Sequence, residues 1–92
     1  MPGPGGYVGS PNIFVSTANQ ELVTKHPTWS YPYAFREFSF LNYADCHVKI
    51  NGSSDPIFLK AEQGFSMSLG LIPVKSFIVV ESGIECQFIG AY

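Results

Sequence analysis

The sequence predicts an all-β fold, a small antiparallel β-sandwich or jelly-roll-like barrel preceded by an extended N-terminal arm. No segment shows a helical period over three turns, because Gly or Pro interrupts most windows where a helix could begin. Short runs rich in β-branched and aromatic residues recur at regular spacing between turn residues. A length of 92 residues allows a single core. We therefore expect an arm over residues 1–12 and one β-sandwich domain over residues 13–92, with about seven or eight short strands.

The arm is predicted from its glycines and prolines. Residues 1–12, MPGPGGYVGSPN, contain three Pro and four Gly, too many for a helix or a central strand. Such a segment cannot form a core of its own, so we expect it to lie along neighbouring chains, with packing against its own domain as the alternative. The residues predicted to contact a partner in this arm are Pro2, Pro4, Tyr7, Val8 and Pro11.

The first part of the domain contains three strand candidates and one loop. The run NIFVST from Asn12 is predicted to be a strand that ELV continues after a break at Ala18 and Asn19. The segment TKHPTWSYPY carries two prolines and three aromatic residues and is predicted to be an ordered loop. AFREFSF follows as a strand with apolar residues on both faces.

The second half gives the clearest strand pattern. In DCHVKIN, alternation places Cys46, Val48 and Ile50 inward and the residues between them outward. PIFLK and FSMSL are the next two strand candidates. Finally, SFIVVE and IECQFIGAY flank Ser82 and Gly83, which predicts a hairpin with a two-residue turn.

The stretch INGSSDPIFLKAEQGFSM, residues 50–67, contains two polar interruptions between strand candidates. These turns could hold a ligand or could belong to the scaffold. Their charged groups are too few and too dissimilar for catalysis, so we expect residues 51–56 to form a surface turn at the exposed end of the sandwich or at a subunit contact.

Composition limits the classes of partner. Charged residues are only 13% of the chain, which suggests that part of its surface is covered by other chains in the working state. The five Lys and Arg residues are scattered singly, so we expect no direct binding of nucleic acid. No run of about 18 apolar residues and no signal-peptide pattern are present, so we expect no membrane span and synthesis in the cytosol.

No pattern predicts a catalytic or metal site. His26 and His47 lie in different segments without further ligands at metal-binding spacing, so we expect no metal and no cofactor. Cys46 and His47 are adjacent in a predicted strand and should point to opposite faces, which is the wrong geometry for proton transfer. We interpret Cys46 and Cys86 as buried free thiols, with a disulfide as the alternative. The protein is expected not to be an enzyme.

A binding role remains. The loop HPTWSYPY holds Trp29, Tyr31 and Tyr33, residue types that anchor protein–protein contacts. The same three side chains could stack on sugar rings as a carbohydrate-binding module, or could fold over the open end of the sandwich.

The second half of the chain resembles small β-sandwich virion structural proteins of tailed bacteriophages. The segments that carry the resemblance, over residues 35–92, are FSFLN with Asn42 closing a strand, the strands at 48–50 and 57–59, the turn at 60–65, and the final strand–turn–strand at 77–92. AEQG departs from the pattern because it lacks the Pro of the more usual turn.

The resemblance implies a non-enzymatic capsid decoration or cement protein that binds and stabilises the assembled head. Its partners would be the major capsid protein or other virion proteins. The chain would act as a homo-oligomer or in many copies, in a virion assembled in the host cytoplasm. A neck, tail or fibre-attachment component is the alternative within the virion.

Overall fold

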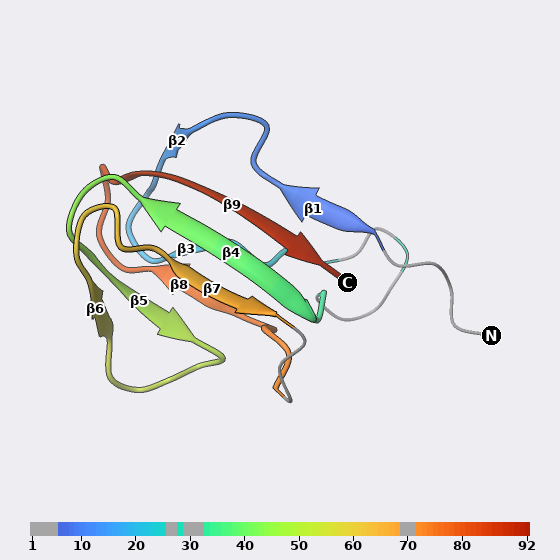
Figure 1. The fold of residues 1–92 in the computed structure, drawn as a ribbon. Coiled ribbons are helices and arrows are strands. Elements are labelled where there is room, and N and C mark those ends of the chain that lie inside the picture. The colour runs from blue at the N-terminus through green and yellow to red at the C-terminus, as the bar shows by residue number, and fades with distance from the viewer. Residues whose placement is uncertain (1–5, 26–27, 29–32, 69–71) are drawn as a thin grey trace.

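The structure, a computed structural model, describes residues 6–25, 28, 33–68 and 72–92 (Figure 1). These residues form two antiparallel sheets that pack face to face, and they contain no helix, so the prediction of an all-β sandwich is confirmed. Nine strands are described where the sequence predicted seven or eight. Sheet 1 consists of β1 (Tyr7–Gly9), β2 (Phe14–Val15), β4 (Glu37–Asn42), β7 (Phe65–Ser68) and β9 (Glu85–Ala91). Sheet 2 consists of β3 (Gln20–Glu21), β5 (Cys46–Ile50), β6 (Ile57–Leu59) and β8 (Phe77–Val79).

The strand order explains how the two sheets are held together. Sheet 1 runs β1–β9–β4–β7, with β2 also paired to β9, and sheet 2 runs β3–β8–β5–β6. Among the described strands, only β1–β2 and β5–β6 are consecutive strands within one sheet; every other pair of consecutive strands lies in different sheets. The chain therefore crosses the sandwich repeatedly, and its connecting segments join both sheets.

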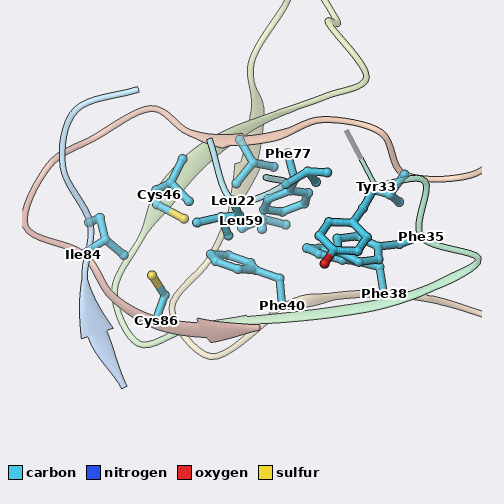
Figure 2. Close-up of a cluster of buried hydrophobic side chains, with 14 residues drawn as sticks. Leu22, Tyr33, Phe35, Phe38, Phe40, Cys46, Leu59, Phe77, Ile84 and Cys86 are labelled. Atoms are coloured by element: carbon cyan, nitrogen blue, oxygen red, sulfur yellow. The ribbon is translucent and has the colours of Figure 1, made fainter. Parts of the chain in front are cut away.

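The core lies between the sheets and is rich in phenylalanine (Figure 2). In β4, Phe38 and Phe40 alternate with exposed or half-buried residues, as expected for a strand with one buried face. The ring of Phe77 from the opposite sheet lies 4.9 Å from that of Phe38 and 4.8 Å from that of Phe40, measured between centroids. The buried apolar residues described are Leu22, Val23, Tyr33, Phe35, Phe38, Phe40, Cys46, Val48, Leu59, Val74, Phe77, Val79, Ile84 and Cys86.

The predicted hairpin across Ser82 and Gly83 is wrong. β8 pairs with β3 and β5 in sheet 2, whereas β9 pairs with β1, β2 and β4 in sheet 1. The segment between them is an arch over the end of the sandwich. A hairpin and an arch bury alternate residues in the same way and differ only in the backbone partners, so the alternation of apolar residues could not separate them.

Ser16 fixes this arch. Its hydroxyl donates to the carbonyl oxygen of Glu81 at 2.7 Å and accepts from the N–H of Ile84 at 3.1 Å. The backbone N–H of Ser16 also donates to the carbonyl oxygen of Ile84, and its carbonyl oxygen accepts from the N–H of Gly83. Since Ser16 is 3% exposed, these bonds hold the crossing from β8 to β9 in place without help from solvent.

Part of the predicted arm belongs to sheet 1. Residues 7–9 form β1 and pair with residues 89–91 of β9, and Gly6 and Tyr92 exchange backbone hydrogen bonds. Val8 is half-buried against the core, while Tyr7 is 76% exposed. Residues 6–9 therefore pack against their own domain, which is the alternative that the sequence left open.

The polar turn at residues 60–64 is organised by the buried side chain of Asn42. The amide nitrogen of Asn42 donates to the carbonyl oxygens of Leu59 and Lys60 at 3.3 and 3.0 Å, and its oxygen accepts from the N–H of Gly64 at 2.9 Å. Gly64 has a φ of 68°, and a side chain there would meet the carbonyl oxygen of Phe40. This turn is therefore part of the scaffold.

The other polar turn, which follows β5, is organised by Asn51. Asn51 has a φ of 52°, and its side-chain oxygen accepts from the N–H groups of Lys75 and Ser76. Its amide nitrogen donates to the carbonyl oxygen of Pro73 at 2.9 Å. The exposed turn after β5 is thus tied to the segment that leads into β8, which again indicates a structural role.

Both cysteines are buried and free, as the sequence interpretation expected. Cys46 lies on β5 and Cys86 on β9, and Figure 2 shows both side chains turned into the space between the sheets. Burial raises the pKa of each thiol to about 11, with smaller contributions to Cys46 from Glu81 and Asp45 and to Cys86 from Cys46. At neutral pH both thiols are protonated and serve as small apolar groups.

Candidate interaction surface

The outer face of sheet 1 exposes apolar side chains above a floor of small residues. Tyr7 on β1 is 76% exposed and Ile89 on the neighbouring β9 is 51% exposed. The register places Gly9, Ile89, Ser39 and Ser66 in one row across β1, β9, β4 and β7. Because Gly9 and the two serines are small, the larger side chains stand above this row.

These side chains form an open groove of about 260 Å³ across the sheet. Tyr7, Ile89 and Ala91 supply its apolar surface, Ser39 and Ser66 supply hydroxyl groups, and one carboxylate lies in it. The groove is lined by Tyr7, Glu37, Phe38, Ser39, Ser66, Met67, Ile89, Gly90 and Ala91. Apolar area with a few hydroxyls and little charge suits contact with another protein surface.

A second hollow lies along the connection between β1 and β2. It has a volume of about 500 Å³ and is lined mainly by residues 9–14 together with Gln20 and Phe88. Ile13 is 50% exposed at its rim, and Phe14 meets Phe88 edge-on with ring centroids 6.3 Å apart. Phe14 and Phe88 pack against the core on the inner side of sheet 1, so this hollow lies at the edge of the sandwich and is separate from the groove.

The outer face of sheet 2 carries Phe58, which lies on the edge strand β6 and is 52% exposed. Ile57, 45% exposed, points to the other face of this strand, opposite the buried Val48. The ring of Phe58 meets that of His47 edge-on with centroids 5.5 Å apart. Nδ1 of His47 lies 2.5 Å from a carboxylate oxygen of Glu81, and the other oxygen accepts from the N–H of His47 at 2.7 Å. The Glu81 side chain thus forms hydrogen bonds with the N-terminal part of β5.

Acid is expected to weaken the fold partly through Glu81. Burial alone would raise the pKa of its carboxyl, but the hydrogen bonds from the backbone and ring of His47 outweigh this and hold the pKa below its ordinary value of 4.5. The stabilisation is therefore complete above pH 4.5 and is lost as pH falls through the lower pKa of the folded state.

The check is urea unfolding over a series of pH values for the parent chain and Glu81→Gln. The free energy of unfolding of the parent should fall more steeply below pH 4.5 than that of the variant. Glu85→Gln, which removes an exposed carboxyl from sheet 1, is the control. Equal slopes for the parent and Glu81→Gln would contradict this role of Glu81.

The structure separates the residues that the sequence predicted for partner binding. Tyr7 is exposed on the groove, Val8 is half-buried beside it, and Pro11 is exposed beside the second hollow. Tyr33 is only 7% exposed and stacks on Phe35 with ring centroids 5.5 Å apart, so its prediction as a surface contact is wrong. Gly90 leaves room for this cluster, because a side chain there would meet the ring of Phe35. Pro2, Pro4, Trp29 and Tyr31, like His26, lie outside the described residues.

Sequence reasoning missed Ile89, Ile57 and Phe58 as exposed apolar residues. In QFIGA, Ile89 follows Phe88 and looks like one more core residue of an apolar strand. The available signal was the alternation from Cys86, which is buried, through Gly90, which places Ile89 on the opposite face. For Ile57 and Phe58, the flanking Pro56 and Lys60 indicated an edge strand.

Among the described residues, no group of three or more His, Cys, Asp or Glu side chains is arranged to hold a metal ion. The described part of the chain also contains no helix long and apolar enough to cross a membrane. In comparisons with known proteins, no family model, curated protein or solved structure matches the chain.

Proposed function

We propose that the protein is a non-enzymatic structural component of a phage virion, a decoration or cement protein that binds the assembled capsid through the outer face of sheet 1. The exposed apolar groove between Tyr7 and Ile89 is the observation that carries the proposal. A monomeric surface usually keeps such apolar side chains scattered, and a contiguous group of them marks a contact with another chain. The phage context comes from the sequence resemblance over residues 35–92.

The groove suits a flat protein partner. Its floor of Ser39 and Ser66 allows close approach, and the side chains of Tyr7 and Ile89 supply the desolvated area that dominates protein–protein contacts. Glu37 is the carboxylate of the groove and gives the contact a polar side. If the partner surface spans neighbouring capsid subunits, it exists only after assembly, and binding stabilises the assembled head by mass action.

The proposal predicts that Ile89→Ser weakens attachment to capsids about tenfold or more while the domain stays folded. Ile89 is half exposed, so its replacement should change the free energy of unfolding by less than about 1 kcal/mol. The measurement is co-sedimentation of the purified chain with particles of the phage that encodes it. Phe58→Ser is the matched control, because Phe58 is equally exposed but lies on the outer face of sheet 2.

Full attachment of Ile89→Ser, or loss of attachment only in Phe58→Ser, would show that sheet 1 is not the contact. Absence of the chain from purified virions by mass spectrometry would remove the proposal altogether. A neck, tail or fibre-attachment role is the alternative within the virion. Copy number separates the two roles, since a capsid component is present in hundreds of copies and a neck or tail ring in about six or twelve.

A further inference from the structure

Within the described part of the chain, the outer edge of β1 has backbone groups without a hydrogen-bond partner. Among the described strands, β1 pairs with β9 alone, along one of its two edges. Gly6 exchanges both backbone hydrogen bonds with Tyr92, and the N–H of Ser10 donates to Phe88 at 3.0 Å. Because hydrogen-bonded pairs alternate along an antiparallel ladder, Val8 also faces β9. The N–H and C=O groups of Tyr7 and Gly9 therefore point away from β9 toward the open edge.

This edge lacks the features that normally protect one. Native edge strands carry Lys, Pro or a bulge that prevents pairing with another chain, and Tyr7–Gly9 contains none of these. At the edge of sheet 2, β6 lies between Pro56 and Lys60. At the other edge of sheet 2, the carboxylate of Glu21 in β3 accepts from the N–H groups of Val23 and Phe77. β1 is therefore an edge open to pairing and bordered by exposed apolar side chains.

We propose that β1 binds the β1 strand of a second copy of this chain, antiparallel and about a twofold axis at Val8. In this register, Tyr7 lies opposite Gly9 of the second copy, and Gly9 lies opposite its Tyr7. These are the residues whose backbone groups point outward, so both pairs form complete hydrogen-bonded pairs of an antiparallel ladder. The two copies of sheet 1 then become one continuous sheet.

The side chains fit this pairing. Residues opposite each other in an antiparallel sheet point to the same face, so the ring of Tyr7 lies over Gly9 of the second copy, which has no side chain to block it. Gly9 is beside Ile89 in the register of β1 and β9. Each Tyr7 ring can thus cover Gly9 and contact Ile89 of the other copy, which buries part of the exposed area of both side chains.

Charge and area determine the strength of the association. β1 carries no charged residue. Glu37 is the acidic residue in the same row across the sheet as Tyr7, and it lies two strands, or about 10 Å, from Tyr7. The twofold axis therefore brings no like charges together. A three-residue ladder with two rings buries on the order of several hundred Å², less than the roughly 1,200–2,000 Å² of stable complexes. We expect weak, concentration-dependent pairing that becomes effective where many copies are held close together.

Pairing would place two capsid-facing grooves on one surface, which extends the proposed function. The biological role of the pairing therefore rests on that proposed function. The test of the pairing needs only the purified full chain. In sedimentation velocity, the average mass should rise as protein concentration approaches about 1 mM. Over the same series, the amide protons of Tyr7 and Gly9 should become protected from exchange, while that of Val8, bonded to β9, should not change.

Tyr7→Lys is expected to weaken the association about tenfold or more, since it removes the ring and adds a charge to the edge. Tyr7→Phe, which keeps the ring, should associate like the parent chain. Phe58→Lys places the same charge on the exposed outer face of sheet 2, away from β1 and the groove, and should also associate normally. Near-UV circular dichroism of each variant confirms that it is folded.

A chain that stays monomeric up to about 1 mM, or an association that Tyr7→Lys leaves intact or Phe58→Lys abolishes, overturns the proposal. So does protection of Tyr7 and Gly9 that arises only when capsids are added, because the occupant of the edge is then a strand of another protein. Pairing of the purified parent chain through Tyr7 and Gly9, together with no attachment of the chain to capsids, would support this inference separately from the capsid proposal.

Discussion

Asn42→Leu is expected to lower the free energy of unfolding by about 3 kcal/mol or more. Leucine has a similar volume, so the cost comes from backbone groups that lose their partner. The Asn42 side chain is fully buried and donates to the carbonyl oxygens of Ala44, Leu59 and Lys60, while it accepts from the N–H of Gly64. The bonds to Leu59 and Lys60 join the end of β4 in sheet 1 to the end of β6 in sheet 2, and those to Ala44 and Gly64 fix the segments that follow β4 and precede β7.

Two variants test this explanation. Asn42→Asp keeps the acceptor but replaces the donor with a carboxylate facing carbonyl oxygens, so it should destabilise the fold at least as much as leucine. Asn51→Gly removes three similar bonds at an exposed turn, where water can replace them, and glycine tolerates the φ of 52° there, so it should cost only about 1 kcal/mol. Urea unfolding measures all three. A stability of Asn42→Leu within about 1 kcal/mol of the parent would contradict the role of Asn42.

Strand positions could be predicted from the sequence because burial follows a period of two. Residues 46–50 illustrate this: Cys46 and Val48 are buried, Ile50 packs against the core, and His47 and Lys49 lie between them with partial exposure. Strand partners could not be predicted in the same way. The alternation of residues 77–91 is the same whether β8 and β9 pair or face each other, and the arch depends on Ser16, about 65 residues earlier in the chain.

The same limit applies to the interaction surface. Tyr7 was predicted as a contact residue because it lies in a Gly/Pro-rich segment, and it is exposed. Tyr33 was predicted from a similar aromatic loop, yet it lies between Phe35 and Tyr92 in the core. The side of a loop that faces the core depends on neighbours distant in sequence, so aromatic content alone could not separate these two tyrosines.

The two polar turns after β5 and β6 illustrate the distinction between scaffold and surface. Asn42 and Asn51 use their side chains to bond backbone groups of distant segments, so the polar residues that first suggested a ligand site maintain the shape of the sandwich. The surface available for binding is instead the apolar face of sheet 1, where Tyr7 and Ile89 are exposed. Loss of stability and loss of binding should therefore map to different residues.

Phe77→Ala is expected to be the most destabilising of these changes in the core, at about 3–5 kcal/mol. Phe77 is fully buried on β8 and lies within 4.9 Å of the rings of Phe38 and Phe40, between centroids, and 5.7 Å from that of Phe65. Its ring is thus the group of sheet 2 that fills the space between the phenylalanines of β4 and β7 in sheet 1. Because the free energy of unfolding of a small domain is only about 5–15 kcal/mol in total, this loss should lower the urea midpoint severely.

Phe58→Ala is the matched control for Phe77→Ala, since it removes the same ring from the opposite face of sheet 2. Phe58 is 52% exposed and its ring contacts that of His47, so removal of the Phe58 ring should lower the free energy of unfolding by about 1 kcal/mol or less. Phe77→Leu should lie between the two, because leucine refills part of the cavity. If the midpoints of Phe77→Ala and Phe58→Ala coincide, the sheets are not held together by the ring of Phe77, and the aromatic cluster cannot be the main contact between them.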